Sequence, residues 1–496
     1  MDTIVAQATP PGMGGLAVVR ISGDDADRVL QTLTSDRGTD GSAGTPQTEP
    51  GLPEPRRATL MEIVDPDDGR IIDRAVVTRF QGPASYTGED VVEISCHGGW
   101  LTPRLVVEAC VRAGAREAEP GEFTRRAYLR GKLDLVQAEA VADLVEARST
   151  ALRDAALGQL ERGLSRRVSE LRERLVRVEA LLAHHVDFPE EDDAPVPMDD
   201  VVAEAARLRE EMAAMLATAP EGELLREGAL AVFAGRPNVG KSSLYNALVG
   251  EERAIVTEEA GTTRDALEAT VQLGGFPFRL VDTAGLRKSE ERIEKLGIEV
   301  ARRYAGGADV VLYCVEAARR VEDEEVEFLQ GLQAPVVLVE TKVDLLRGGA
   351  REAKGEGREA DGALQGGTDR SGAGSRVAPR GRPEVVEVGV AARVAVSVES
   401  GEGLDRLRKV LPELVYASVV TAGSEVPVLT RRRHARALES AVAEVEAFSR
   451  AVAEGLPAEV AATHLRAAEV ALEELLGIVS VDDVLDVVFR EFCIGK

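Results

Sequence analysis

A strand pattern, a glycine-rich loop and a helical pattern follow one another from Ala229 onwards. The apolar run Ala229–Ala234 has the length of a strand, the loop reads GRPNVGKS from Gly235 to Ser242, and a helical pattern begins directly after it. Glycines let backbone N–H groups curl around phosphate oxygens, and a helix start adds partial positive charge. Lys241 supplies a point charge to the outer phosphates, and the Ser242 hydroxyl can ligate Mg²⁺. Because all three parts occur in the required order, the sequence predicts a nucleotide-phosphate site rather than a simple turn.

The length and composition favour a soluble protein of several domains. Its 496 residues exceed what one hydrophobic core holds, so about three domains are expected. No apolar run approaches the ~20 residues of a membrane helix, the start lacks the features of a secretory signal, and the four cysteines have neither metal-type nor disulfide-type spacing. We therefore expect a cytoplasmic protein with no membrane partner. The net charge of −26 argues against non-specific coating of nucleic acid but leaves a local basic patch open.

Residues 1–130 mix strand and loop patterns, and the following residues become helical. β-rich runs occur at Leu16–Ile21, Ala75–Phe80 and Asp90–Ser95, and residues 36–57 have the composition of a surface excursion. A second helical stretch ends near Ala217, and helices return over residues 438–476. The helical stretch that precedes these two is predicted to be one helix that ends at Pro189. Its apolar residues are spaced by three and four: Leu157, Leu160, Leu164, Val168, Leu171, Leu175, Val178 and Leu182.

Strand and helix patterns alternate between residues 228 and 417. Such alternation predicts a parallel sheet covered by helices on both faces. Residues 347–383 carry almost no large apolar side chain and are expected to form a disordered loop. With helical patterns on both sides, this domain is predicted to be inserted into a helical domain of residues 131–227 and 418–496. The strand patterns lie at Ala229–Ala234, Phe278–Val281, Val310–Val315, Val336–Glu340 and Val394–Val398.

Further motifs follow the phosphate loop in the order that GTPases use. Gly261–Asp265 stands where a Thr hydroxyl can complete a Mg²⁺ shell. At the end of the next strand, Asp282 would hold Mg²⁺ through water, and the Gly285 N–H would meet the γ-phosphate. Asp344 follows a later strand, and its carboxylate can accept both N1–H and N2–H of guanine, a donor pair that adenine lacks. The segment that begins at Ser397 resembles the loop that closes over the base in GTPases.

These four motifs together predict a GTP site. The residues expected to contact the nucleotide are Asn238, Val239, Gly240, Lys241, Ser242, Ser243, Thr257, Gly261, Thr262, Thr263, Asp282, Thr283, Ala284, Gly285, Thr341, Lys342, Asp344 and Ser397. Of these, Ser242 and Thr263 are the expected direct Mg²⁺ ligands.

The motif set resembles the TRAFAC-class GTPases and, within them, the MnmE (TrmE) family of tRNA-modification GTPases. The resemblance to that family rests on TIVAQATPP at Thr3–Pro11, TGEDVVE at Thr87–Glu93, KLDLVQAEA at Lys132–Ala140 and the final CIGK. It covers nearly the whole chain except the loops after Asp36 and Arg347.

This resemblance implies a three-part protein. An α+β domain at 1–130 would bind tetrahydrofolate and form a homodimer, next to a helical domain and an inserted Ras-like G domain at 228–417. With the FAD-dependent partner MnmG, in a heterotetramer, the family adds an aminomethyl-type or carboxymethylaminomethyl group to C5 of the wobble uridine of certain tRNAs. That reaction uses 5-formyl-tetrahydrofolate or a related reduced folate, and it requires GTP hydrolysis.

The resemblance also implies an unusual way of hydrolysing GTP. Leu286 follows the Asp282–Gly285 motif and has no group that can orient water, where Ras-like proteins place Gln. In the family a switch II Glu acts through water instead, and Glu294 matches it, although from sequence alone an exposed Glu would be an ordinary helix residue. A K⁺ ion takes the place of an arginine finger. Its matching ligand positions are Asn238, Thr257, Glu259 and Thr262.

One position departs from the family pattern. Thr341 stands where the guanine motif begins with Asn, and a hydroxyl replaces the amide's hydrogen bonds only in part. Because Asp344 keeps the carboxylate, we predict that GTP is still preferred but bound more weakly.

By the same resemblance, Arg20, Glu93, Lys132 and Lys496 match positions around the folate, where a carboxylate can pair with the pterin edge and cations with glutamyl carboxylates. Cys493 is a candidate nucleophile toward the uracil ring, and a small packing residue is the equal alternative. The basic run 431–436 could contact tRNA phosphates or simply begin a solvated helix. Without the resemblance, Arg20 and Glu93 would be read as surface charges.

Two other functions remain open at this point. One is a ribosome-assembly GTPase that acts as an RNA-binding switch, against which the final CIGK and the N-terminal resemblance both count. The other is a folate-dependent one-carbon transferase whose G domain only regulates it.

Overall fold

The structure, a computed structural model, describes residues 2–34, 52–187, 197–251, 268–282, 306–317, 319–346, 389–422, 426–478, 482–490 and 492–496. The chain divides into two compact units. The first combines Met1–Glu146, Ala156–Ala213 and Arg433–Lys496, and the second combines Ala147–Ala155 and Ala214–Arg432.

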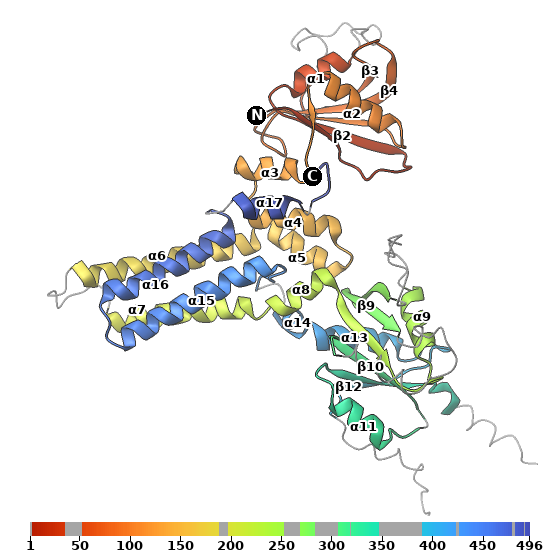
Figure 1. Cartoon of the computed structure of the whole chain (residues 1–496), viewed down its shortest axis with the longest axis vertical. Helices are drawn as coiled ribbons and strands as arrows, with labels where there is room; N and C mark the ends of the chain where they lie inside the picture. Colours follow the sequence, from red (N-terminus) through yellow and green to blue (C-terminus); the bar gives the residue numbers. More distant parts are fainter. Residues whose placement is uncertain are drawn as a thin grey trace, which may run out of the picture. The chain divides into compact units, whose positions relative to one another are not determined.

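A six-stranded sheet with helices α1 and α2 on one face forms the N-terminal part of the first unit (Figure 1). The strand order is β3-β4-β5-β2-β1-β6, and every neighbouring pair is antiparallel except β1 and β6. The strands predicted near residues 16, 75 and 90 are confirmed as β2, β4 and β5, whereas β1 and β3 carry no strong sequence signal. The elements are β1 (Ile4–Gln7), β2 (Leu16–Ser22), α1 (Ala26–Leu33), β3 (Thr59–Val64), β4 (Ile71–Phe80), β5 (Val91–His97), α2 (Thr102–Arg112) and β6 (Arg116–Glu117).

Alternation along β2 decides which side chains reach each face of this sheet. Val19 and Ile21 pack into the core under α1 and α2. Arg20 lies between them in sequence, so it points to the opposite face. There it meets Phe123 of α3 (Glu122–Leu129), whose ring belongs to a separate small apolar cluster.

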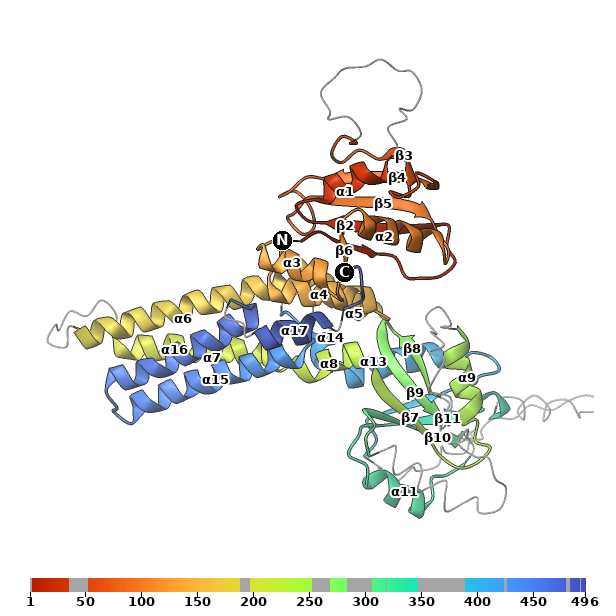
Figure 2. The same cartoon turned by 45° about the horizontal axis from the view of Figure 1, so that its top comes forward.

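Helices make up the rest of the first unit, and α6 lies alongside α16 in both views (Figures 1 and 2). The prediction of a single helix over Leu157–Leu182 is wrong. The chain forms two helices there, because Arg162 takes a left-handed conformation with φ of +67°. Leu157, in the first of them, is exposed rather than packed in a core. Regular apolar spacing does not reveal such a break. The helices are α4 (Leu135–Glu146), α5 (Thr150–Leu160, which begins in the second unit), α6 (Gly163–Asp187), α7 (Met198–Leu216), α15 (Arg432–Ala453), α16 (Ala458–Leu476) and α17 (Asp482–Arg490).

The second unit is a six-stranded sheet with helices on both faces, as the alternating pattern predicted. Its order is β12-β11-β10-β7-β9-β8, with α9 and α13 packed on one face and α11 on the other. Two details differ from expectation: β8 joins the edge antiparallel to β9, and β12 ends at Ala395 rather than Val398. The elements are α8 (Ala219–Glu227), β7 (Ala229–Ala234), α9 (Lys241–Glu251), β8 (Glu268–Leu273), β9 (Phe276–Asp282), β10 (Val310–Glu316), α11 (Asp323–Gln330), β11 (Val336–Thr341), β12 (Ala392–Ala395), α13 (Leu404–Val415) and α14 (Ala417–Ala422).

Parallel pairing brings the carboxyl ends of β7, β9, β10, β11 and β12 to one edge of the sheet. Ligands of open α/β sheets bind at such an edge. The described residues of the predicted nucleotide motifs lie at or after these strand ends, so the fold gathers them there. The loop expected at 347–383 lies outside the described residues.

Candidate functional site

The phosphate loop connects β7 to α9 and closes around the ammonium group of its own lysine. Lys241 Nζ donates to the carbonyl oxygens of Gly235 and Arg236 at 2.8 and 2.6 Å, and the side chain is buried. Gly235 has φ of +127°, and a Cβ there would lie 2.3 Å from the Cys314 carbonyl oxygen on β10. A larger residue would therefore push the loop away from the sheet and move the ammonium group with it.

Ser242 and Asp282 meet at the carboxyl ends of β7 and β9. The Ser242 hydroxyl donates to Asp282 Oδ2 at 2.7 Å, and Asp282 is almost completely buried. A hydroxyl beside a carboxylate fits Mg²⁺, which takes oxygen ligands and keeps several waters. The N–H groups at the start of α9 fit phosphate oxygens. The residues present thus suit a Mg²⁺-nucleotide.

The first two residues of the predicted guanine motif are tied to the phosphate loop. Thr341 is buried, and its hydroxyl donates to the Val239 carbonyl at 2.5 Å. Lys342 has φ of +60°, donates from Nζ to the Asn238 carbonyl at 2.9 Å, and forms an ion pair with Glu316. These bonds fix the position of the base-binding end relative to the phosphate-binding end.

The remaining guanine-site residues lie close by. Asp344 is half-buried and begins a helical segment shortly after β11, and Ser397 is fully buried just after β12. The Ser397 N–H donates to the Glu402 carbonyl at 2.9 Å, which closes the loop that follows β12. Asn238 and Ser243 are both exposed, and Asn238 has φ of +63°. The structure therefore brings the described members of the nucleotide motifs to one sheet edge.

Nine of the predicted site residues lie outside the described residues, so their expected roles stay predictions. They are Thr257, Glu259, Gly261, Thr262, Thr263, Thr283, Ala284, Gly285 and Glu294.

In the first unit, Arg20 and Glu93 face each other across β2 and β5. Arg20 Nε and Nη2 both donate to Glu93 Oε1, at 3.0 and 2.8 Å. The Arg20 guanidinium lies over two aromatic rings, 5.4 Å from the centroid of Tyr86 and 5.7 Å from that of Phe123. Its side chain is 16% exposed and that of Glu93 is 28% exposed, so the pair remains accessible from one side. A planar cation over aromatic faces beside a carboxylate can bind a flat, polar heterocycle.

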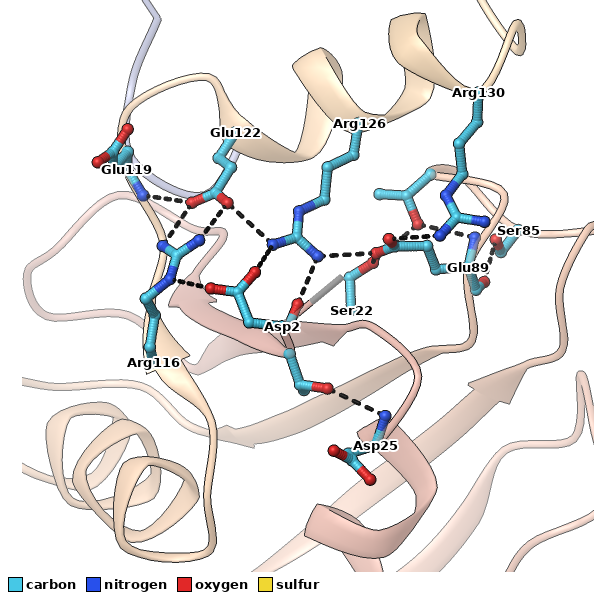
Figure 3. A network of polar contacts seen from close by, with 12 residues as sticks. Asp2, Ser22, Asp25, Ser85, Glu89, Arg116, Glu119, Glu122, Arg126 and Arg130 are labelled. Carbon is cyan, nitrogen blue, oxygen red and sulfur yellow. Dashed lines mark hydrogen bonds and ion pairs between the residues drawn. The ribbon is translucent and has the colours of Figure 1, made fainter.

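The loop that carries Tyr86 is held by a buried network centred on Glu89 (Figure 3). Glu89 is fully buried and accepts hydrogen bonds from Ser22 Oγ (2.8 Å), Arg126 Nη1 (3.1 Å) and Arg130 Nη2 (2.9 Å). The outer part of the network continues from Arg126 to Asp2, Glu122 and Arg116. Burial alone would raise the pKa of Glu122, but hydrogen bonds from Arg116, the Glu119 N–H and Arg126 lower it below its usual range.

The other two predicted folate residues border the same region. Lys132 Nζ donates to the Pro83 carbonyl at 2.9 Å, in the loop that carries Tyr86. The Lys496 carbonyl accepts from the Phe123 N–H at 3.1 Å, so the last residue of the chain lies beside the ring that supports Arg20. Cys493 is exposed, and its carbonyl accepts from the Gly121 N–H at 3.4 Å.

Comparison with known proteins decides the family. Residues 3–132 match the model of the GTP-binding protein TrmE N-terminus, and residues 135–493 match that of the MnmE helical domain. The chain is 39% identical to the tRNA modification GTPase MnmE of Moorella thermoacetica, over 100% of this chain and 99% of that protein. It is 40% identical to that of Azoarcus sp., over 100% and 98%. The chain belongs to the MnmE family of tRNA modification GTPases.

A solved structure of the G domain of the T. maritima FeoB iron transporter is also similar, at 24% identity over 38% of this chain and 98% of that chain, with a TM-score of 0.23. In the described part of this MnmE-family chain, no helix is long and apolar enough to cross a membrane. Membership of the MnmE family confirms the fold class and the GTPase assignment that the sequence predicted.

In the basic run 431–436, suggested as one possible phosphate-binding cluster, the first three arginines are buried or paired with carboxylates. Arg431 is buried, Arg432 pairs with Glu223, and Arg433 pairs with Glu139 at 2.8 Å. Carboxylates thus compensate the charge of Arg432 and Arg433. The sequence could not show this, because the partners are distant along the chain.

Sequence reasoning also missed residues that support the sites. Glu89 lies within the TGEDVVE motif, yet nothing in the sequence separates a buried carboxylate from an exposed one. Tyr86 and Phe123 gave no signal, because single aromatic residues are usually core residues.

Proposed function

We propose that this GTPase acts with MnmG to add an aminomethyl-type or carboxymethylaminomethyl group to C5 of the wobble uridine of certain tRNAs, with a reduced folate as one-carbon donor. Membership of the MnmE family supports the tRNA reaction. The folate role is supported most by the Arg20–Glu93 pair, which lies over two aromatic rings beside the loop that Lys132 contacts. We further propose that the chain works in the cytoplasm as a homodimer through residues 1–130 and as a heterotetramer with MnmG.

In the proposed reaction, the residues of the second unit divide the work on GTP. Lys241 holds the outer phosphates, Ser242 and Asp282 serve the Mg²⁺ site with Thr263, and Asp344 selects guanine. Asn238, Thr257, Glu259 and Thr262 would hold K⁺, and Glu294 would orient water. When bound, the two cations supply positive charge to the phosphate oxygens.

The first unit would bind the folate and the tRNA. Glu93 would pair with the pterin edge, and Arg20, Lys132 and Lys496 would hold anionic groups of the folate. Cys493, exposed near the chain end, is the proposed nucleophile toward the uracil ring; if a Cys493→Ala protein retains the modified uridine in cells, that role is excluded.

Replacement of Arg20 tests the folate role separately from GTP hydrolysis. In cells that lack the native protein, Arg20→Ala should abolish the modified wobble nucleoside, measured by mass spectrometry, while the purified variant keeps its GTP turnover. Arg74→Ala is the matched control, because Arg74 forms the same kind of cross-strand pair with Glu62 on exposed β3 and β4. Retention of the modified nucleoside in the Arg20 variant would contradict the folate role. Normal tRNA modification in the deletion strain, with defective ribosomal subunits, would instead favour the ribosome-assembly function.

A further inference from the structure

The side chain of Arg236 leaves the phosphate loop and contacts the start of α11. Its guanidinium forms an ion pair with Glu322, and its Nε lies 3.4 Å from Glu325 Oε1. Arg236 and Glu322 are 41% and 56% exposed, whereas Glu325 is only 7% exposed. The phosphate loop, which follows β7, is therefore joined to a helix that comes after β10 in the sequence.

The carboxylates that receive Arg236 are held in place by other groups. Glu322 and Glu325 form a capping box at the N-terminus of α11, in which the Glu322 N–H donates to Glu325 Oε2 at 2.9 Å. Glu325 also accepts from Tyr313 Oη of β10 and from Arg319 Nη2, each at 2.7 Å. Burial alone would raise the pKa of Glu325, but these hydrogen bonds lower it, which favours its ionised form.

The main chain of Arg236 contacts Lys241 of the phosphate loop directly. Its carbonyl oxygen accepts from Lys241 Nζ at 2.6 Å, a shorter bond than the one from Nζ to the Gly235 carbonyl at 2.8 Å. A continuous series of contacts therefore runs from Tyr313 through Glu325 and the Arg236 side chain to the Arg236 carbonyl and Lys241. We propose that Arg236 is a positioning residue of the GTPase: its pairing with α11 fixes the loop carbonyl that places Lys241 for the outer phosphates.

A positioning role differs measurably from that of an ordinary surface ion pair. Exposed pairs contribute little to folding, so loss of Arg236 should leave the melting temperature nearly unchanged. Its effect should instead appear in nucleotide binding. If the loss weakens the hold on Lys241 by about one hydrogen bond, KM for GTP and Kd for GDP should rise about three- to tenfold, with a smaller change in kcat.

The experiment compares variants of the full-length protein by GTP turnover, GDP binding and thermal unfolding. Arg236→Ala should raise KM as stated, and Arg236→Lys should restore part of the loss because it keeps the charge but not the fork. Glu322→Gln should have a smaller effect in the same direction. Arg320→Ala is the matched control, since Arg320 is exposed nearby and has no ion pair with the described residues.

A double variant decides whether the two side chains act together. If Arg236 works through Glu322, the effects of Arg236→Ala and Glu322→Gln on KM should not add. Additive effects, or an Arg236→Ala protein that behaves like Arg320→Ala, would overturn the proposal. A fall in melting temperature without a change in KM would also overturn it, because the pair would then serve folding alone.

Discussion

Thr341 is the position at which this chain departs from the guanine motif, and its hydroxyl faces the phosphate loop. The hydroxyl donates to the Val239 carbonyl at 2.5 Å and lies 3.1 Å from the Val315 carbonyl. It therefore joins the end of β11 to the loop, one residue before Gly240. Replacement by Val keeps the shape of the side chain and removes only this donor.

The magnitude follows from the burial of the bond. Thr341 is 3% exposed, so in Thr341→Val the carbonyls that it faces lose a donor in a place with little access to water. A buried group left without its partner costs about 1–3 kcal/mol. If displacement of the phosphate loop removes about 1 kcal/mol of nucleotide-binding free energy, Kd for GTP and for GDP should each rise about fivefold.

Equilibrium binding of fluorescent GTP and GDP, with ATP as competitor, measures this effect. Thr341→Ser is the matched control, because it keeps the hydroxyl and should bind nearly as the native protein does. Thr341→Asn should bind GTP more tightly than the native protein, since an amide can also contact the base. Native affinity in Thr341→Val would refute the argument that the hydroxyl holds the loop. Comparable binding of ATP and GTP by the native protein would refute guanine selection by Asp344.

Three other predictions concern catalysis and stability. Glu294→Ala should keep GTP binding while hydrolysis collapses, and near-normal turnover would exclude its role. GTP turnover should be faster in K⁺ than in Na⁺, and equal rates would remove Asn238 as a K⁺ ligand. Burial alone would raise the pKa of Glu139, but attraction to His434 and Arg433 lowers it far below its usual 4.5. The unfolded state then takes up the proton first, so the free energy of unfolding should fall as pH drops below about 4.5. Glu139→Gln should flatten this pH dependence, as followed by chemical denaturation, and should cost about 3 kcal/mol at neutral pH because it leaves the Arg433 guanidinium, only 22% exposed, with a neutral partner.

The nucleotide edge could be predicted from the sequence because its signals are local. Strand, glycine-rich loop and helix follow one another within a short stretch of sequence; Lys241 and Ser242 come after β7, and Asp282 ends β9. Parallel pairing then brings them together without further information. The same logic could not find β8, because an antiparallel edge strand breaks the alternation on which the prediction rested.

The supporting contacts could not be predicted, because their partners are distant in the sequence. Arg20 and Glu93 are 73 residues apart, and Arg433 and Glu139 are 294 apart. In a chain with many arginines and carboxylates, sequence alone does not say which pairs form. The break at Arg162 is hidden for another reason: a single left-handed residue changes the direction of the chain without altering the apolar spacing.

Lysines and arginines at these sites have different kinds of partners. Arg20 and Arg236 pair with carboxylates, whose geometry matches the planar fork of a guanidinium. By contrast Lys132, Lys241 and Lys342 each donate to main-chain carbonyls of loops, and Lys342 also forms an ion pair with Glu316.

A neutral carbonyl orients an ammonium group without cancelling its charge. Loop carbonyls orient Lys132 and Lys241 in this way, one beside the loop that carries Tyr86 and one inside the phosphate loop. In a protein with a net charge of −26, such charges are where an anionic ligand gains most. Lys241→Arg should therefore lose nucleotide binding although it keeps the charge, because the bulkier guanidinium cannot enter the loop. Nucleotide binding retained within twofold would contradict this account.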